Sequence, residues 1–202
     1  MSMGATMGLA PIAFLAVWTG MMAVMMAPSV APVGALYART VQTSRAPRLA
    51  AFGLAYLLVW ALAGIPALLL ATWLDSFGMD NMRLGRYALA VALALAGLYE
   101  LSPLKEACLR HCRSPLGLLM HYSSFQGRMR DFRAGLHHAL YCFGCCWALF
   151  VVLVAVGTMN LLAMAVLAAV ILLEKVWSQG LLVSRVVAVA ALVLAGVVAF
   201  TA

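Results

Sequence analysis

The chain has 202 residues, of which 66% are hydrophobic and only 9% are charged, and its mean hydropathy is +1.06. This composition leaves too little polar surface to cover a soluble globule, so it excludes a water-soluble domain and indicates a lipid bilayer as the surroundings. The net charge of +7 predicts no nucleic-acid partner, because the basic residues lie in connectors between apolar runs. No glycine-rich phosphate loop is present in the sequence, so we expect no nucleotide site either.

Six apolar segments follow one another along the chain, and most approach the roughly 20 residues that cross ~30 Å of hydrocarbon. They predict an all-α fold, a polytopic transmembrane bundle of about six helices that forms a single membrane-embedded domain over residues 1–202. A short interfacial helix or loop is expected between the third and the fourth helix. The six segments are Gly8–Leu36, Leu49–Leu74, Tyr87–Leu101, Ala134–Val156, Asn160–Val176 and Leu181–Ala202.

The first segment has no Lys or Arg before Arg39, so we interpret it as a retained helix rather than a cleaved signal peptide. Pro28 and Pro32 are expected to bend this helix. Met22 and Met25 share one of its faces, and a thioether sulfur is a soft ligand that suits Cu(I). Methionine also fills gaps in apolar packing, which is the alternative explanation for these two residues.

Basic residues are concentrated in alternate connectors, which predicts the orientation of the chain in the membrane. Under the positive-inside rule these connectors face the cytoplasm, and both termini therefore face outward. Eleven of the 13 cationic side chains lie in them: Arg39, Arg45, Arg48, Lys105, Arg110, Arg113, Arg128, Arg130, Arg133, Lys175 and Arg185.

All five cysteines and all four histidines fall between residues 108 and 146. Cysteine and histidine are soft and borderline ligands for copper and zinc, so their concentration in one stretch predicts a metal site. In a short helix bounded by Pro103 and Pro115, the side chains of Cys108, His111 and Cys112 lie on one i, i+3, i+4 face. Two thiolates and an imidazole are expected to converge there.

The second half of the predicted metal site lies on the fourth apolar segment. His138, Cys142 and Cys145 share a helical face there, with Cys146 at its margin. Residues Leu116–Arg133 predict an interfacial turn that brings both halves together at the cytoplasmic membrane boundary. The spacing matches no regular zinc finger, so the prediction rests on ligand chemistry. The two histidines outside both groups are expected to face solvent or lipid headgroups: His121 and His137.

Two carboxylates near the hydrocarbon form a further group of interest. Glu100 and Glu174 fall at the cytoplasmic ends of the third and fifth segments, where a carboxylate is costly unless it is paired or functional. One interpretation makes them partners of a metal-bound imidazole or acceptors of thiol protons. The other pairs them with Lys105 and Lys175 at the level of the headgroups.

Several motifs resemble those of a family of bacterial integral membrane proteins described as predicted metal-binding membrane proteins. They span nearly the whole chain, and the Tyr-Cys-x-Gly-Cys-Cys-Trp element at 141–147 is the most specific of them. The resemblance implies a location in the bacterial inner membrane, and it implies that His111 and His137 are variable positions. The motifs are Met21–Pro28, Leu104–Gly117, His138–Trp147, Met159–Asn160 and Glu174–Lys175. The implied ligands are Cys108, Cys112, His138, Cys142, Cys145 and Cys146.

The residues together predict a metal-handling membrane protein rather than an enzyme, with Cu(I) ahead of zinc because thiolates and thioethers predominate. Acquisition, transfer or insertion of the metal is expected, together with a partner protein that acts as subunit, metal donor or metal acceptor. Two alternatives stay open. One is a membrane thiol-disulfide oxidoreductase that uses Cys142 and Cys145, at the head of a helix. The other is a non-catalytic scaffold subunit with a structural zinc site.

Overall fold

A computed structural model describes residues 10–41, 44–76, 82–123, 125, 127, 129–157 and 160–201 of the chain. These residues form helices and no strands, so the predicted all-α class is confirmed. The helices are α1 (Pro11–Thr40), α2 (Arg45–Ser76), α3 (Met82–Glu100), α4 (Pro103–Cys112), α5 (Pro115–Ser123), α6 (Arg130–Val156), α7 (Leu161–Val176) and α8 (Gly180–Phe200).

Each predicted apolar segment coincides with a helix, but six membrane spans are not confirmed. Within the described residues, four helices are long and apolar enough to cross a membrane, namely α1, α2, α6 and α8. A fifth candidate is α3 together with α4, which are bent by 67° at the break between them. Helix α7 has only 16 residues, about 24 Å at 1.5 Å per residue. The expected interfacial segment consists of two short helices, α4 and α5.

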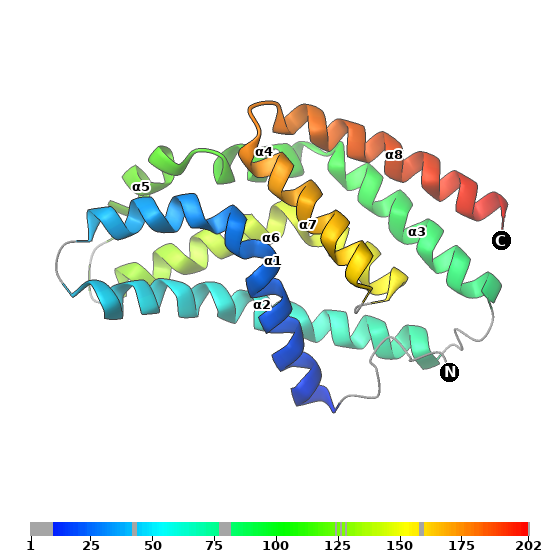
Figure 1. Ribbon diagram of the computed structural model, residues 1–202, viewed down its shortest axis with the longest axis horizontal. Helices are drawn as coiled ribbons and strands as arrows, with labels where there is room; N and C mark the ends of the chain where they lie inside the picture. Colours follow the sequence, from blue (N-terminus) through cyan, green and yellow to red (C-terminus); the bar gives the residue numbers. More distant parts are fainter. Residues whose placement is uncertain are drawn as a thin grey trace.

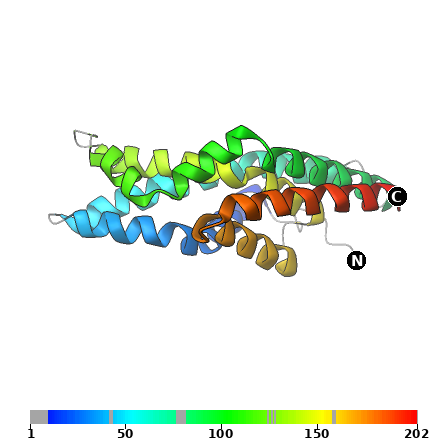
Figure 2. The ribbon, with the colours of Figure 1, turned by 90° about the horizontal axis from the view of Figure 1, so that it is seen from above.

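The helices pack mainly as two pairs. Helix α2 lies along α6, and α3 lies along α8, as both ribbon views show (Figures 1 and 2). A glycine permits the close approach in the first pair, because a Cβ atom on Gly135 of α6 would stand 2.3 Å from the carbonyl oxygen of Phe52 on α2. Small residues at such crossings let the backbones approach closely. Helix α6 is thus held centrally, with α4 on another side.

Helix α1 bends in its middle (Figure 1), and Pro28 and Pro32 lie inside it. Proline removes a backbone donor and clashes with the preceding turn, which explains the bend. The helix presents a buried face to the core over its first turns, where Trp18 stacks on Phe14 and meets the edge of Phe150 of α6. The predicted bend therefore agrees with the structure.

Helices α3, α7 and α8, which we call the short helices, each have one end at the same level, near the middle of the molecule's long axis. Helices α3 and α7 end there and α8 begins there, whereas α2 and α6 continue past this level (Figure 1). Hydrogen bonds tie the ends together, since Ser184 Oγ donates to Glu100 Oε2 at 2.7 Å and Lys105 Nζ donates to Glu174 Oε2 at 2.8 Å. The cysteine-bearing parts of α4 and α6 lie beside these ends.

Candidate metal centre

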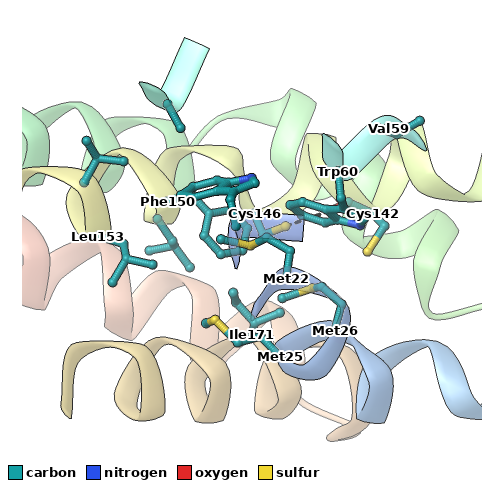
Figure 3. Close-up of a cluster of buried hydrophobic side chains, with 14 of the residues drawn as sticks. Met22, Met25, Met26, Val59, Trp60, Cys142, Cys146, Phe150, Leu153 and Ile171 are labelled. Carbon is teal, nitrogen blue, oxygen red and sulfur yellow. Dashed lines mark hydrogen bonds between the residues drawn. The ribbon is translucent and has the colours of Figure 1, made fainter. Parts of the chain in front are cut away.

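The sulfur atoms of α1, α4 and α6 gather in one part of the hydrophobic core. We call this group of eight residues the sulfur cluster. Figure 3 shows Met22 and Met26 of α1 on the side of that helix that faces Cys142 and Cys146 of α6, whereas Met25 lies beside Ile171 of α7. All five cysteines are free. Its members are Met22, Met25, Met26, Cys108, Cys112, Cys142, Cys145 and Cys146.

The two predicted halves of the metal site do meet. The thiol of Cys112 on α4 lies in hydrogen-bonding contact with that of Cys145 on α6. Cys108 lies against the backbone of α6, because its Sγ would stand 3.0 Å from a Cβ at Gly144. The glycine therefore makes room for Cys108, and the i, i+3, i+4 spacing places Cys142, Cys145 and Cys146 on one face of α6.

A lysine side chain from α7 reaches into the sulfur cluster. Lys175 Nζ lies 2.9 Å from Cys142 Sγ and 4.0 Å from Met26 Sδ, so it bridges α6 and α1. Tyr56 Oη on α2 lies 3.1 Å from the same Cys142 sulfur. An ammonium in this position stabilises negative charge on sulfur. One interpretation of the sequence pairs Lys175 with a carboxylate instead. Residue spacing within α7 cannot show which residues of α6 lie beside it.

The two buried glutamates share a single cation. Lys105 Nζ donates to Glu100 Oε1 at 2.7 Å and to Glu174 Oε2 at 2.8 Å, and all three side chains are at most 1% exposed. The expected pairing with Lys105 is therefore present, and all three side chains lie in the interior of the protein. Buried ion pairs of this kind are strongly destabilised when one partner is removed. The trio fixes the end of α7, and with it the adjacent Lys175.

His138 is buried at the edge of the sulfur cluster. Its ring stacks between Phe52 and Tyr56, with centroids 6.1 and 6.0 Å away, and it is 2% exposed. Its Nδ1 atom is buried without a hydrogen-bond partner among the described residues. A buried nitrogen with an unused lone pair or proton is costly, and a ligand there would relieve that cost. The structure thus places His138 close to Cys142, with which the sequence analysis groups it.

The other three histidines are not members of the sulfur cluster. His111 stacks on Tyr141 with ring centroids 3.9 Å apart, and it also contacts His137. His121 is exposed, as expected for a residue at the surface, whereas His137 is half-buried between it and His111. The predicted secondary ligand His111 therefore faces a group of imidazoles rather than the thiols.

Met26 belongs to the sulfur cluster although the sequence interpretation named only Met22 and Met25. Met22 and Met26 are both 0% exposed and Met25 is 8% exposed. Because Met26 follows Met22 by four residues, it lies on the same helical face, and this spacing was the available signal. Met22 and Met26 thus place two buried thioethers on the side of α1 that faces the cysteines of α6 (Figure 3).

Among the residues that the structure describes, no three His, Cys, Asp or Glu side chains form a ready-made group for a metal ion. The thiols instead donate to the main chain, with Cys145 Sγ at 3.1 Å and Cys146 Sγ at 2.8 Å from the carbonyl oxygen of Cys142. A metal ion must therefore draw these thiols away from that carbonyl. Thiolate and thioether donors suit Cu(I), so the donor types fit that ion once the thiols have turned.

The pair Cys142 and Cys145 does not lie at the head of a helix, which corrects one expectation. Helix α6 begins at Arg130, and Cys142 lies 12 residues further along a continuous helix. The helix dipole acts only within about the first turn, so it does not activate either thiol here. Both cysteines are buried at 1% exposure. The dipole argument for a thiol-disulfide oxidoreductase is therefore lost.

Comparison with known proteins connects this donor set to copper. A family model named PpoB2 and described as a copper chaperone matches residues 15–198, which include the sulfur cluster and all four histidines. Searches of curated proteins and of solved structures found no significant match. The family match covers most of the chain, and the chain belongs to the PpoB2 copper chaperone family.

Proposed function

We propose that the protein binds Cu(I) as cargo in the sulfur cluster and passes it to a partner protein. The observation that carries the proposal is the meeting of Met22 and Met26 of α1 with Cys142, Cys145 and Cys146 of α6 in one buried core. Thioether and thiolate sulfur is the donor combination that selects Cu(I) over harder ions. Membership of a copper chaperone family supports the same cargo.

The charge of Lys175 favours a monovalent ion. Its ammonium lies 2.9 Å from Cys142 Sγ, so the core already accommodates one positive charge against sulfur. Cu(I) carries the same charge, whereas a zinc ion would bring a second positive charge beside the ammonium. Like charges repel strongly where water is excluded. We infer that the cluster discriminates against divalent ions partly through Lys175.

The position of the ends of α3, α7 and α8 supports a site at the membrane boundary. Helices α3 and α8 have 19 and 21 residues, or about 29–32 Å, which is close to the thickness of the hydrocarbon layer, and α7 ends at the level where α8 begins (Figure 1). The sulfur cluster lies where these helices end or begin. With the basic connectors inside, this boundary is the cytoplasmic one of a bacterial inner membrane.

Transfer to a partner requires the ion to leave a buried site. Cys112 is the least buried member of the thiol group, and its thiol contacts Cys145. It also lies at the end of α4, where the chain turns into α5. We propose that Cys112 is the exit ligand, because ligand exchange with an incoming thiolate needs a sulfur that the partner can approach.

The test is metal analysis of the purified, untagged protein carrying Cys142→Ser and Cys145→Ser. Stoichiometric copper is expected in the wild-type protein and is expected to be lost in the double variant, because two adjacent soft ligands are removed. X-ray absorption counts sulfur and nitrogen ligands in the same samples. Circular dichroism and thermal unfolding establish that the variant is folded.

Copper content unchanged by the double substitution would reject the sulfur cluster as the site. Tightly held zinc with mixed sulfur and nitrogen ligands, without exchange to a chelator, would also contradict the proposal. That result would favour a scaffold with a structural metal.

A further inference from the structure

We propose that His111, His121 and His137 form a second copper site, which takes up the ion before the sulfur cluster receives it. We call these three residues, together with Tyr141, the histidine cluster. Its role in delivery rests on the proposed function, but its ability to bind a metal does not. The ligand is a copper ion held by imidazole nitrogen, without change of oxidation state on transfer to the thiols.

Three helices that are separate in sequence bring these imidazoles together. His111 comes from α4, His121 from α5 and His137 from α6. The ring of His137 lies centrally, with its centroid 5.2 Å from that of His111 and 4.9 Å from that of His121. Two imidazoles that bind one ion through nitrogen at about 2.1 Å place their centroids roughly 5 Å apart. The observed spacing therefore suits shared coordination.

Two nitrogen atoms of the histidine cluster have no hydrogen-bond partner among the described residues although they are buried. They are Nε2 of His111 and Nδ1 of His137. A buried imidazole nitrogen normally has a partner, because leaving it without one costs on the order of 1–3 kcal/mol. The rings are stacked rather than converged on one point, so coordination requires them to turn about their side-chain bonds. Such turns are small movements for half-exposed residues at the surface.

The histidine cluster adjoins the sulfur cluster along two helices. His111 immediately precedes Cys112 on α4, and Tyr141 immediately precedes Cys142 on α6. Consecutive helical residues point about 100° apart, so each helix presents imidazole or tyrosine on one face and sulfur on the next. His137 likewise precedes His138, whose buried ring lies at the edge of the sulfur cluster.

Burial increases from one cluster to the other. His121 is exposed, His111 and His137 are half-buried, and Cys142 is 1% exposed. Imidazole is a borderline ligand and thiolate is a soft one, so Cu(I) gains affinity as it moves inward along this gradient. An ion captured at the surface would thus pass to the thiols without a large barrier of desolvation.

The delivery step is tested with the variant His111→Phe plus His137→Phe, which keeps aromatic stacking and removes the imidazoles. Stopped-flow loading of the full-length protein in detergent, from a soluble Cu(I) chelate, is expected to slow by about tenfold or more. The final amount of thiol-bound copper should stay the same. Tyr122→Phe is the matched control, because it removes the hydroxyl of a ring that packs edge-on against His137 without removing an imidazole. Loading at the wild-type rate in the double variant would overturn the delivery role.

The binding step is tested separately by X-ray absorption on protein in which all five cysteines are serine. Copper bound through nitrogen, and lost on adding His111→Phe and His137→Phe, is expected. If the five-serine protein does not fold, the wild-type protein loaded with two equivalents of Cu(I) replaces it, and the second ion should show nitrogen ligands. Absence of any nitrogen-bound copper would overturn the site. Nitrogen-bound copper in a protein whose thiols bind none would reject the proposed function and leave the histidine site standing.

Discussion

Met22 and Met26 are the side chains that distinguish the proposed copper site from a site with cysteine ligands only, because thioether sulfur suits Cu(I). Both are fully buried, and Met26 Sδ lies 4.0 Å from the same Lys175 ammonium that contacts Cys142. In an apolar core a methionine is exchangeable with leucine at little cost, usually below about 1.5 kcal/mol. If the thioether sulfur binds the metal, exchange of the methionine for leucine should weaken metal binding and leave folding nearly unchanged.

The variant Met22→Leu plus Met26→Leu is expected to weaken Cu(I) binding by about tenfold or more while the melting temperature changes little. The reason is that leucine fills a similar volume but offers no soft donor. Competition with a Cu(I) chelator measures the affinity. Met164→Leu serves as the control, because Met164 packs against the same core from α7. Equal affinities for the two variants would mean that these methionines only fill space.

Helix α6 is the element on which the fold and the proposed site both depend. It carries His138 and three of the cysteines, and it packs against α2, α3 and α4. Its contact with α2 is close because Gly135 has no side chain, and this places Tyr56 of α2 beside Cys142. A change in the separation of α2 and α6 should therefore reach both the stability and the metal site.

Gly135→Ala is expected to destabilise the protein by about 1–3 kcal/mol, because the new Cβ would stand 2.3 Å from a backbone oxygen that cannot easily move. Thermal unfolding in detergent measures the effect. Gly53→Ala on α2 is the matched control, since a Cβ there meets nothing within 4 Å. Alanine also favours a helix over glycine by about 1 kcal/mol, so the control should be neutral or stabilising. Equal melting temperatures would show that α2 and α6 do not pack as closely as described.

At the scale of the whole molecule, the first turns of α2 and α6 extend beyond the level at which α3 and α7 end and α8 begins (Figure 1). Arg48 of α2 forms an ion pair with Asp131 of α6 at 3.0 Å in the part of the chain that extends beyond the short helices. Helix α8 runs the other way and ends at Phe200 (Figure 1). If the short helices cross the hydrocarbon, the basic end is cytoplasmic and the end of α8 is external.

Cysteine accessibility tests this orientation in cells. A single cysteine introduced as Thr201→Cys, in a background without native cysteines, is expected to react with a membrane-impermeant maleimide from outside. Arg39→Cys, at the end of α1, should react only after the cells are made permeable. Both positions are exposed, so access through the membrane is the main difference between them. Labelling of Arg39→Cys in intact cells would reverse the proposed topology and the side on which copper is handled.

Local spacing and composition determined a large part of this protein. Apolar runs predicted the helices because hydrocarbon requires satisfied backbone hydrogen bonds, and the i, i+3, i+4 pattern predicted the shared faces of Cys108 with Cys112 and of Cys142 with Cys145. Helix length was less predictable: α7 has 16 residues, fewer than the roughly 20 that cross the hydrocarbon layer, and α3 turns sharply into α4. Whether a segment spans a bilayer depends on where its ends are held by neighbouring helices.

The tertiary structure alone decided which distant side chains join the cysteines. Met26 and Lys175 are separated by 149 residues, yet Lys175 Nζ lies 4.0 Å from Met26 Sδ. Likewise His121 and His137, which the sequence predicts to face solvent or lipid headgroups, lie in one group with His111. Periodicity describes one helix at a time, whereas the partners of a face depend on the packing of several helices. Composition thus determined that soft ligands lie on α1, α4 and α6, and helix packing determined that they lie together.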